Sequence, residues 1–269
     1  MRLTYRGWVR RRAMQLTPSS DESLDRLVGD WRIFQLKRGH RFSTDDLLTA
    51  WKAQQVMPQA LRLCDLGSGI GSVGLMTLFN MAPEAKMTTL EVQKLSYDLA
   101  KRTVAYNDLD DRVTLMNGDM RDTDPGGPFQ LVTGSPPYIP LGKGVVSPHP
   151  QRAGARMELK GSVFDYCLAA ARILEPEGRF VFCHSGTDPR PEQAVKAAGF
   201  TLLERQDVIF REGKRPTIAL FVCAWEGQRR DAAALTIRDG NGEFTAEYLR
   251  TRGEMGNALE MRTKSAPAS

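Results

Sequence analysis

Histidine and long apolar runs are scarce in this chain, and each shortage removes a class of function. The three histidines, His40, His149 and His184, are scattered and form no metal-binding set, so we predict no metal ion and assign no histidine a catalytic role. No run approaches the roughly 20 consecutive apolar residues that a membrane helix needs. No apolar segment follows the basic N-terminus, as it would in a signal peptide. We therefore expect neither a membrane-embedded segment nor secretion.

Cysteine is also sparse, and its spacing does not indicate metal binding. The four cysteines match no Cys-x-x-Cys or zinc pattern and stand in apolar surroundings: Cys64, Cys167, Cys183 and Cys223. Buried free thiols are typical of a reducing compartment. We therefore expect a cytoplasmic protein, with one alternative, because an arginine-rich, acid-free start could also be a mitochondrial transit peptide.

Acidic residues are absent from residues 1–13, which makes the start of the chain strongly basic. The whole chain carries a net charge of +5, and this first segment includes Arg10, Arg11 and Arg12. A second cluster, with one glutamate among its members, comprises Arg211, Lys214 and Arg215. Basic arms and loops attract phosphate backbones. Both clusters are therefore candidate nucleic-acid contacts, and solvated surface charge is the alternative.

The composition predicts one large domain with short additions. Hydrophobic residues make up 41% of the chain and charged residues 26%, as in ordinary globular proteins. We expect a basic flexible arm over residues 1–24, one domain over 25–252 and a disordered tail over 253–269. Within the domain, short apolar strands alternate with helical segments, which is typical of a doubly wound α/β sheet.

A glycine-rich turn follows the first of these strands. Leu61–Asp65 is a short apolar run, and Gly67, Gly69 and Gly71 follow it before a helical stretch that ends near Asn80. Glycine lets the backbone approach a ligand closely and permits positive φ, and the first N–H groups of a helix are unpaired. The spacing is GxGxG, so the GxGxxG fingerprint of dinucleotide-binding proteins is disfavoured.

Acidic residues stand where the next two strands end. Strand Met87–Leu90 ends at Glu91, 26 residues after Asp65, and one carboxylate there can accept from both hydroxyls of a ribose. Strand Val113–Asn117 is followed by Asp119, which could accept from a ligand or cap a turn. Open α/β sheets bind ligands at the edge formed by the carboxyl ends of their strands, so we expect these acids beside a ligand site.

A stiff turn follows the fourth strand, Phe129–Thr133, and reads Ser135-Pro136-Pro137-Tyr138. Proline has no N–H and a fixed φ, and it extends the residue before it. The carbonyls near the first two positions are therefore free to accept hydrogen bonds. Such a turn can hold a flat group that bears an –NH2, accept its hydrogens and stack an aromatic ring on its face. An ordinary proline turn that closes a strand is the alternative.

Together these features resemble the class I S-adenosylmethionine (SAM) methyltransferases. Asp-x-Gly-x-Gly-x-Gly after the first strand is similar to their donor-binding motif, and Ser-Pro-Pro-Tyr is similar to the (Asn/Asp/Ser)-Pro-Pro-(Tyr/Phe) motif of members that methylate nitrogen. The resemblance implies SAM as cofactor and a Rossmann-like α/β sheet of seven strands, the last antiparallel. It implies Ser135, Pro136, Pro137 and Tyr138 as catalytic residues, and as donor-binding residues Thr44, Asp45, Asp65, Gly67, Ser68, Gly69, Gly71, Glu91, Val92, Asp119 and Met120.

Three further stretches are similar to one subgroup, the bacterial tRNA adenine-N6 methyltransferases that modify adenine-37 of valine tRNA. They are Phe42–Asp45, Ala155–Glu158 and Gly242–Glu247, and the resemblance covers roughly residues 30–250. It implies RNA as the partner, with the target in the anticodon loop of a tRNA. It also implies Arg156, within the second stretch, as a contact to that RNA.

One departure from the subgroup leaves the acceptor open. The subgroup carries Asn or Asp where this chain has Ser135, and Ser-Pro-Pro-Tyr is also familiar among cytosine-N4 enzymes that act on DNA. The same features would also suit an rRNA methyltransferase, a protein glutamine-N5 methyltransferase of the release-factor type, or a non-catalytic nucleic-acid-binding module that retains SAM. About 60 residues precede the glycine turn, which is too few for the helical N-terminal domain typical of the release-factor enzymes.

Overall fold

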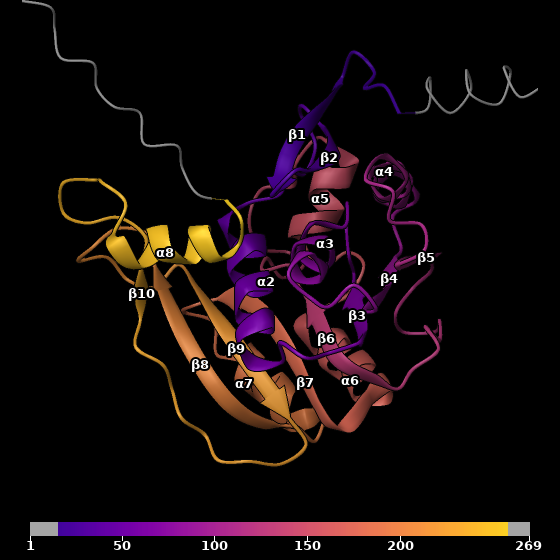
Figure 1. The fold of residues 1–269 in the computed structure, drawn as a ribbon. Helices are drawn as coiled ribbons and strands as arrows, with labels where there is room; N and C mark the ends of the chain where they lie inside the picture. The colour runs from indigo at the N-terminus through magenta and orange to yellow at the C-terminus, as the bar shows by residue number, and fades with distance from the viewer. Residues whose placement is uncertain (1–15, 258–269) are drawn as a thin grey trace, which may run out of the picture.

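Eight strands form one central sheet, and helices cover both of its faces (Figure 1). The computed structural model describes residues 16–257. The predicted arm contacts Arg10, Arg11 and Arg12 and residues 258–269 of the predicted tail lie outside this range. No helix within residues 16–257 combines the length and the apolarity that a membrane span requires.

The sheet has the strand order β10-β8-β9-β7-β6-β3-β4-β5. All neighbouring strands run parallel except β9, which is antiparallel to both β7 and β8. This arrangement confirms the predicted Rossmann-like α/β class, including the antiparallel strand near the end of the chain. The strands are β3 (Arg62–Leu66), β4 (Lys86–Glu91), β5 (Val113–Asn117), β6 (Phe129–Gly134), β7 (Leu174–Ser185), β8 (Thr201–Ile209), β9 (Ile218–Ala224) and β10 (Leu235–Thr236).

The eighth strand, β10, adds to the seven that were predicted. It pairs in parallel with the end of β8, with Leu235 opposite Val208 and Thr236 opposite Ile209. Without it, β8 would be an edge strand that leaves backbone N–H and C=O groups unpaired. The two-residue strand is too short to carry a periodic signal, so its place in the sheet could not be read from the sequence.

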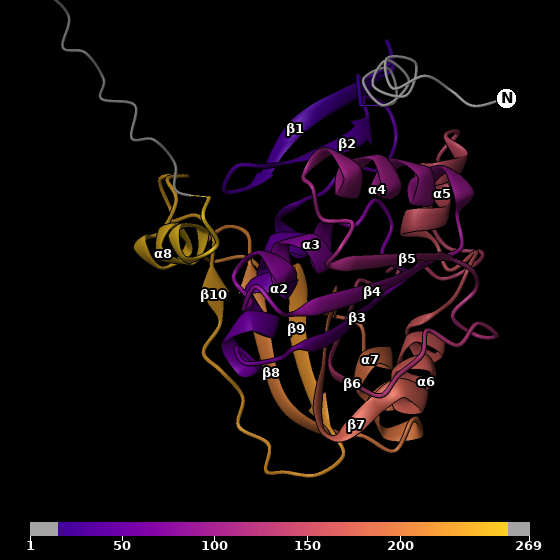
Figure 2. The ribbon, with the colours of Figure 1, turned by 45° about the vertical axis from the view of Figure 1, so that its right-hand side comes forward.

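Two apolar cores hold the helices against the two faces of the sheet (Figure 2). The first face carries α2 (Thr44–Val56), α3 (Ser72–Phe79) and α4 (Lys94–Tyr106), and the second carries α6 (Val163–Ile173) and α7 (Arg190–Ala197). Helix α2 begins after Ser43, which forms a capping box with Asp46. Strands buried on both faces are apolar throughout, and β9 is buried along its whole length.

One β-hairpin and two helices lie outside this framework. Strands β1 (Glu22–Val28) and β2 (Trp31–Leu36) form an antiparallel hairpin that contacts α3 and α4, and β1 begins within the range expected to be a flexible arm. Helix α5 (Pro150–Arg156) follows the loop after the Ser-Pro-Pro-Tyr turn. Helix α8 (Ala246–Glu254) packs on α2 and β10, and beyond it Asn257 donates to the Leu27 carbonyl of β1 at 2.9 Å.

The strand order brings the two predicted ligand-binding turns to one edge. Strand β3 pairs in parallel with β4 on one side and β6 on the other, with Leu66 opposite both Leu90 and Gly134. The carboxyl ends of all three strands therefore lie side by side. The glycine turn leaves β3 and the Ser-Pro-Pro-Tyr turn leaves β6 at this edge, as the sequence predicted.

We predict that the second core depends on a stack of phenylalanines. Phe182 lies between Phe180 and Phe221, with ring centroids 4.9 Å away on each side, and it is fully buried. Phe182→Ala should lower the free energy of unfolding by about 3–5 kcal/mol, because it leaves a cavity. Leu168→Ala on the exposed side of α6 is the control, with a change within about 0.5 kcal/mol. Equal midpoints for the two variants in urea denaturation would contradict the prediction.

Candidate active site

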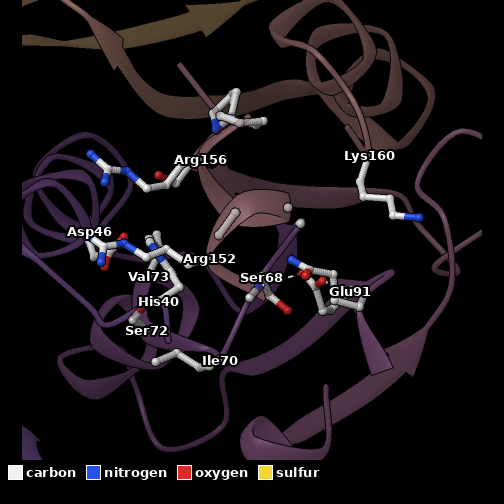
Figure 3. Close-up of a pocket in the computed structure, with 18 of the residues that line it drawn as sticks. His40, Asp46, Ser68, Ile70, Ser72, Val73, Glu91, Arg152, Arg156 and Lys160 are labelled. Carbon is white, nitrogen blue, oxygen red and sulfur yellow. Dashed lines mark hydrogen bonds between the residues drawn. The ribbon is translucent and has the colours of Figure 1, made fainter. Parts of the chain in front are cut away.

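A cavity of about 520 Å³ opens at this edge of the sheet (Figure 3). Its volume falls within the usual range for a small-molecule site, about 300–1,000 Å³. Most of the predicted site residues lie together in its wall: Asp45, Asp65, Gly67, Ser68, Gly69, Glu91, Val92, Met120, Ser135, Pro136, Pro137, Tyr138 and Arg156. The cavity therefore joins the predicted donor-binding turn to the predicted catalytic turn.

The glycine turn lines the cavity, and two of its positions need glycine. Gly67 and Gly69 both have φ of +56°, a region that side chains disfavour. A Cβ on Gly67 would lie 1.8 Å from the Tyr166 hydroxyl, whereas a Cβ on Gly69 would meet no atom within 4 Å. Between them, the Ser68 hydroxyl is buried without a hydrogen-bond partner among the described residues. The turn thus presents close backbone and one unsatisfied hydroxyl to a ligand.

Glu91 is held rigidly at the tip of β4. Its Oε2 accepts from the Gly69 N–H at 2.8 Å and its Oε1 from the Gln93 N–H at 2.6 Å. Each oxygen keeps a second lone pair, so the carboxylate can still accept two hydroxyl donors. Burial raises the pKa of Glu91 despite these two hydrogen bonds, and a hydroxyl-bearing ligand would supply further stabilisation of the charged form.

Asp65 connects the glycine turn to the strand that carries Ser135. Its Oδ1 accepts from the Thr133 hydroxyl of β6 at 2.7 Å, and its Oδ2 accepts from the Gly74 N–H of α3 at 3.0 Å. Burial raises the pKa of Asp65 to about 6. This predicted donor-binding residue therefore also braces the three elements that form the cavity.

A chain of hydrogen bonds runs behind the Ser-Pro-Pro-Tyr turn. The Tyr138 hydroxyl donates to Asp45 Oδ2 at 2.9 Å and lies 3.1 Å from Cys183 Sγ, which lies 3.4 Å from Ser135 Oγ. Burial raises the pKa of Cys183 to about 12, so the group is a thiol. Since Tyr138 gives its proton to Asp45, the thiol donates to Tyr138 and accepts from Ser135. The lone pairs of Ser135 Oγ are therefore left for another donor.

The ring of Tyr138 is half-buried beside a histidine. Its centroid lies 5.1 Å from that of His184, and the planes are tilted by 59°. His184 is fully buried, and burial lowers its pKa to about 4. A neutral ring at this place supports Tyr138 from the side of β7. The four cysteines, Cys183 among them, are buried free thiols, as predicted.

Several predicted residues lie outside the wall of the cavity. The Thr44 hydroxyl lies 3.5 Å from the Tyr248 hydroxyl, and Gly71 caps the start of α3. Asp119 accepts from Arg121 Nε at 2.9 Å and Nη2 at 2.5 Å, and the hydrogen bonds from Arg121 lower its pKa. Its carboxylate is thus already paired within its own turn. Within residues 16–257, no three His, Cys, Asp or Glu side chains form a group that could hold a metal ion.

The predicted basic loop stands at the same edge but beyond the cavity. Its members are exposed and follow β8, which runs parallel to β7: Arg211, Lys214 and Arg215. The Gly186 N–H after β7 donates to the Thr217 carbonyl at 3.1 Å and ties the two loops together. The side chains of these three cations make no hydrogen bond or ion pair with the part of the chain that the structure describes.

The cavity wall also contains residues to which the sequence analysis gave no role in the site. Those with charged or aromatic side chains are Lys37, Arg38, His40, Arg41, Asp46, Arg152, Lys160 and Tyr166. The segment between β2 and α2 supplies most of the first five, and α5 supplies Arg152. Only the four-residue spacing of Arg152 and Arg156 hinted that a helix would place two cations on one face.

Charge is sorted by depth in this site. Carboxylates of Asp45, Asp46, Asp65 and Glu91 lie around the inner wall, and six cations stand in the outer part: Lys37, Arg38, Arg41, Arg152, Arg156 and Lys160. Burial raises the pKa of Asp46 to about 7, and the neighbouring Asp45 adds to the shift. A positively charged ligand would relieve this crowding of acids. The inner site thus suits a cation and the outer site an anion.

A family model described as the methyltransferase small domain matches residues 42–185, more than half of the chain. A tRNA1(Val) (adenine(37)-N6)-methyltransferase of Histophilus somni is 26% identical over 204 residues, which are 75% of this chain and 84% of that protein. A release factor glutamine methyltransferase of Rhodopirellula baltica is 32% identical over 125 residues, but these are 46% of this chain and 35% of that protein.

A solved structure gives independent support for the fold. The predicted O-methyltransferase from Agrobacterium tumefaciens superimposes with a TM-score of 0.57 at 18% identity, and the match covers 80% of this chain and 98% of that one. The similarity at this level of identity concerns the arrangement of strands and helices.

We predict that Asp46 makes the ligand-free protein less stable as the pH rises. Its pKa is about 7 in the folded protein and ordinarily 3.8, so the folded state holds the proton more tightly than the unfolded state. This contribution is complete below about pH 4 and is lost as the pH approaches about 7. Asp46→Asn keeps an acceptor for the Ser43 N–H and should flatten the fall of the melting temperature over this range.

Asp110→Asn, at an exposed position, serves as the control and should keep the pH dependence of the unaltered protein. Thermal denaturation at a series of pH values measures both variants. Superimposable curves for Asp46→Asn and Asp110→Asn would contradict the predicted role of the buried acid.

Proposed function

This chain belongs to the methyltransferase small domain family and is a SAM-dependent N-methyltransferase, and from this premise we propose that its acceptor is the exocyclic amino group of a nucleobase in RNA, with adenine N6 in a tRNA anticodon loop as the substrate. The observation that carries the proposal is that the glycine turn and Ser135 share one cavity. The cytoplasm, where tRNA is modified and thiols stay reduced, is the proposed location.

The inner cavity fits the donor by several independent features. Glu91 offers two lone pairs to the ribose hydroxyls, and the buried Ser68 hydroxyl lacks a partner among the described residues until a ligand arrives. The crowded carboxylates Asp45, Asp46 and Asp65 favour a ligand with a positive centre. SAM supplies an electrophilic methyl group on such a centre, a sulfonium.

Ser135 and Pro136 are the proposed acceptors for the amino hydrogens. An exocyclic amine is a weak nucleophile because its lone pair is delocalised into the ring. The hydrogen-bond chain through Tyr138 and Cys183 points the Ser135 proton away and leaves its lone pairs free. With the Pro136 carbonyl, which no backbone N–H engages in the described chain, Ser135 can hold both hydrogens and localise the amine lone pair. Orientation then supplies much of the rate.

Tyr138 is the proposed stacking platform for the base. Its hydroxyl is anchored to Asp45 and one side of its ring rests near His184, so the ring is fixed before a base arrives. The base must leave its own stack to reach the ring, which costs least in a single-stranded loop. This requirement, together with the similarity to tRNA adenine-N6 enzymes over 75% of the chain, favours the anticodon loop.

Protein glutamine N5 is the second candidate acceptor. The release factor enzyme of Rhodopirellula baltica matches a shorter stretch at higher identity, and a glutamine amide presents the same planar –NH2 to the turn. The exposed cations around the cavity favour a polyanionic substrate instead.

The acceptor can be identified by offering the three substrate classes side by side. The protein is incubated with methyl-labelled SAM and total RNA, total DNA or release factor, and labelled nucleosides are resolved by mass spectrometry. We expect label in RNA as N6-methyladenine. Label in DNA as N4-methylcytosine, in protein as N5-methylglutamine, or in none of the three would overturn the proposal.

We predict that Ser135→Ala lowers kcat for RNA methylation by about 100-fold, as the loss of one preorganised hydrogen-bond partner does in other enzymes. Tyr138→Phe keeps the ring but frees the Cys183 thiol to donate to Ser135, and it should lower kcat by about 10-fold. Single-turnover methylation measures kcat for both variants. Titration calorimetry should show that both variants still bind SAM with the heat of the unaltered protein.

Ser135→Asn is the matched variant, because it restores the acceptor found in the resembled subgroup and should retain transfer. Loss of donor affinity in Ser135→Ala would refute its assignment to the acceptor. Full activity in Tyr138→Phe would refute the hydrogen-bond chain.

A further inference from the structure

Two segments far apart in the sequence are fastened together at the mouth of the cavity. Gln151 of α5 is buried; its Oε1 accepts from the His40 N–H at 3.0 Å and its Nε2 donates to Ser96 Oγ of α4 at 3.1 Å. The packing is so close that a Cβ on Gly39 would lie 2.2 Å from Gln151 Oε1. The segment between β2 and α2 is therefore locked beside α5.

Cations that form no ion pair with the described residues stand around the same cavity. Four exposed side chains in the cavity wall make no hydrogen bond and no ion pair with residues 16–257: Arg38, Arg152, Arg156 and Lys160. We call these four the cationic rim. Figure 3 shows Arg152 and Arg156 on one side of the cavity and Lys160 on the other. Arg156 and Arg152 also act on His40. Burial is the main cause that lowers the pKa of His40 to about 4, and the positive charges of these two arginines lower it further.

The cofactor does not account for this much positive charge. SAM carries one carboxylate, which needs one cation at most, and its sulfonium belongs with the inner acids. Arg152 and Arg156 lie on the same side of the cavity and repel each other. None of the four rim cations has an ion-pair partner in the described chain, so a ligand with several negative charges is the natural complement. The four rim residues line the outer part of the same cavity that Ser135 lines. An acceptor molecule with several phosphates therefore complements the charge of the rim.

We propose that the cationic rim binds consecutive phosphates on both sides of the target nucleotide, and so holds a single RNA strand across the mouth of the cavity. This inference rests on the proposed function and assigns a substrate-binding role to Arg38, Arg152 and Lys160 beside Arg156. A charged groove that follows the backbone is how proteins hold single strands without reading their sequence. The flipped base enters between the cations, and the exposed basic loop after β8 extends the same edge of the sheet.

The test is the salt dependence of RNA binding by the double variant Arg38→Ala/Arg152→Ala. Fluorescence anisotropy with a short labelled RNA hairpin that has an unpaired adenine in its loop gives the affinity at several KCl concentrations. Removing one cation that binds a phosphate should reduce the slope of log K against log[KCl] by about 0.7–0.9. We therefore expect a slope lower by about 1.4–1.8 in this variant, since two such cations are removed.

The control removes the same charge from the opposite edge of the sheet. Lys86 at the start of β4 and Lys196 in the last turn of α7 are exposed and distant from the strand carboxyl ends. Lys86→Ala/Lys196→Ala should keep the slope of the unaltered protein. Donor calorimetry on both double variants shows that the inner cavity is intact.

The outcomes separate this inference from the proposed function. If RNA is methylated but the rim variant and the control have equal slopes, the rim inference fails and the function stands. If the rim variant no longer gives a heat of SAM binding and its salt slope is unchanged, these arginines bind the cofactor, and the inference fails as well. If RNA binding shows the expected slope change but only release factor is methylated, the rim binds RNA and the proposed function fails.

Discussion

One buried carboxylate fixes the donor side and the acceptor side of this site relative to each other. Asp65 receives one hydrogen bond from β6, through Thr133, and one from α3, through Gly74. Strand β3, which carries Asp65, lies between β4 and β6, so the glycine turn, Glu91 and Ser135 all depend on the same three strands. A shift of any one strand would break the cavity, because a sheet is rigid only when its ladders are complete.

The sorting of charge by depth follows from this framework. Acids at strand ends and at the start of α2 are buried because the turns close over them, and their raised pKa values record the free energy of that burial. The ammonium and guanidinium groups of Lys and Arg would lose their hydration in such a space, so they remain on long side chains at the mouth. One cavity can thereby favour a cationic donor inside and a polyanionic acceptor outside.

Ser135 stands where the resembled subgroup has Asn or Asp, and the structure explains how a serine can fill the same role. An amide in this position carries an acceptor oxygen whatever its surroundings, whereas a hydroxyl can donate or accept. Here the Tyr138 proton is taken by Asp45, and the order of donors back through Cys183 leaves Ser135 as an acceptor. The neighbours of Ser135, more than its own chemistry, specify its role.

The order of the strands, the glycine turn and the proline turn along the chain was predictable, because each of these features depends on only a few adjacent residues. Apolar runs followed by Gly67 or Pro136 mark where the chain reverses, and parallel pairing then forces those marks to one edge. A short strand near Leu235 was predicted, but its pairing with β8 was not. The pairing of β1 with β2 and the ion pair between Asp119 and Arg121 were not predicted either, since none of these contacts has a periodic or compositional signature.

What the sequence by itself determined is the fold class and the two turns that face each other across the site. Only the tertiary structure decided which charges surround them. Gln151 meets His40 across 111 residues of sequence and Tyr138 meets Asp45 across 93. Contacts between such distant residues leave no trace in local spacing, and they arise only when two helices and a loop pack on the same edge of the sheet.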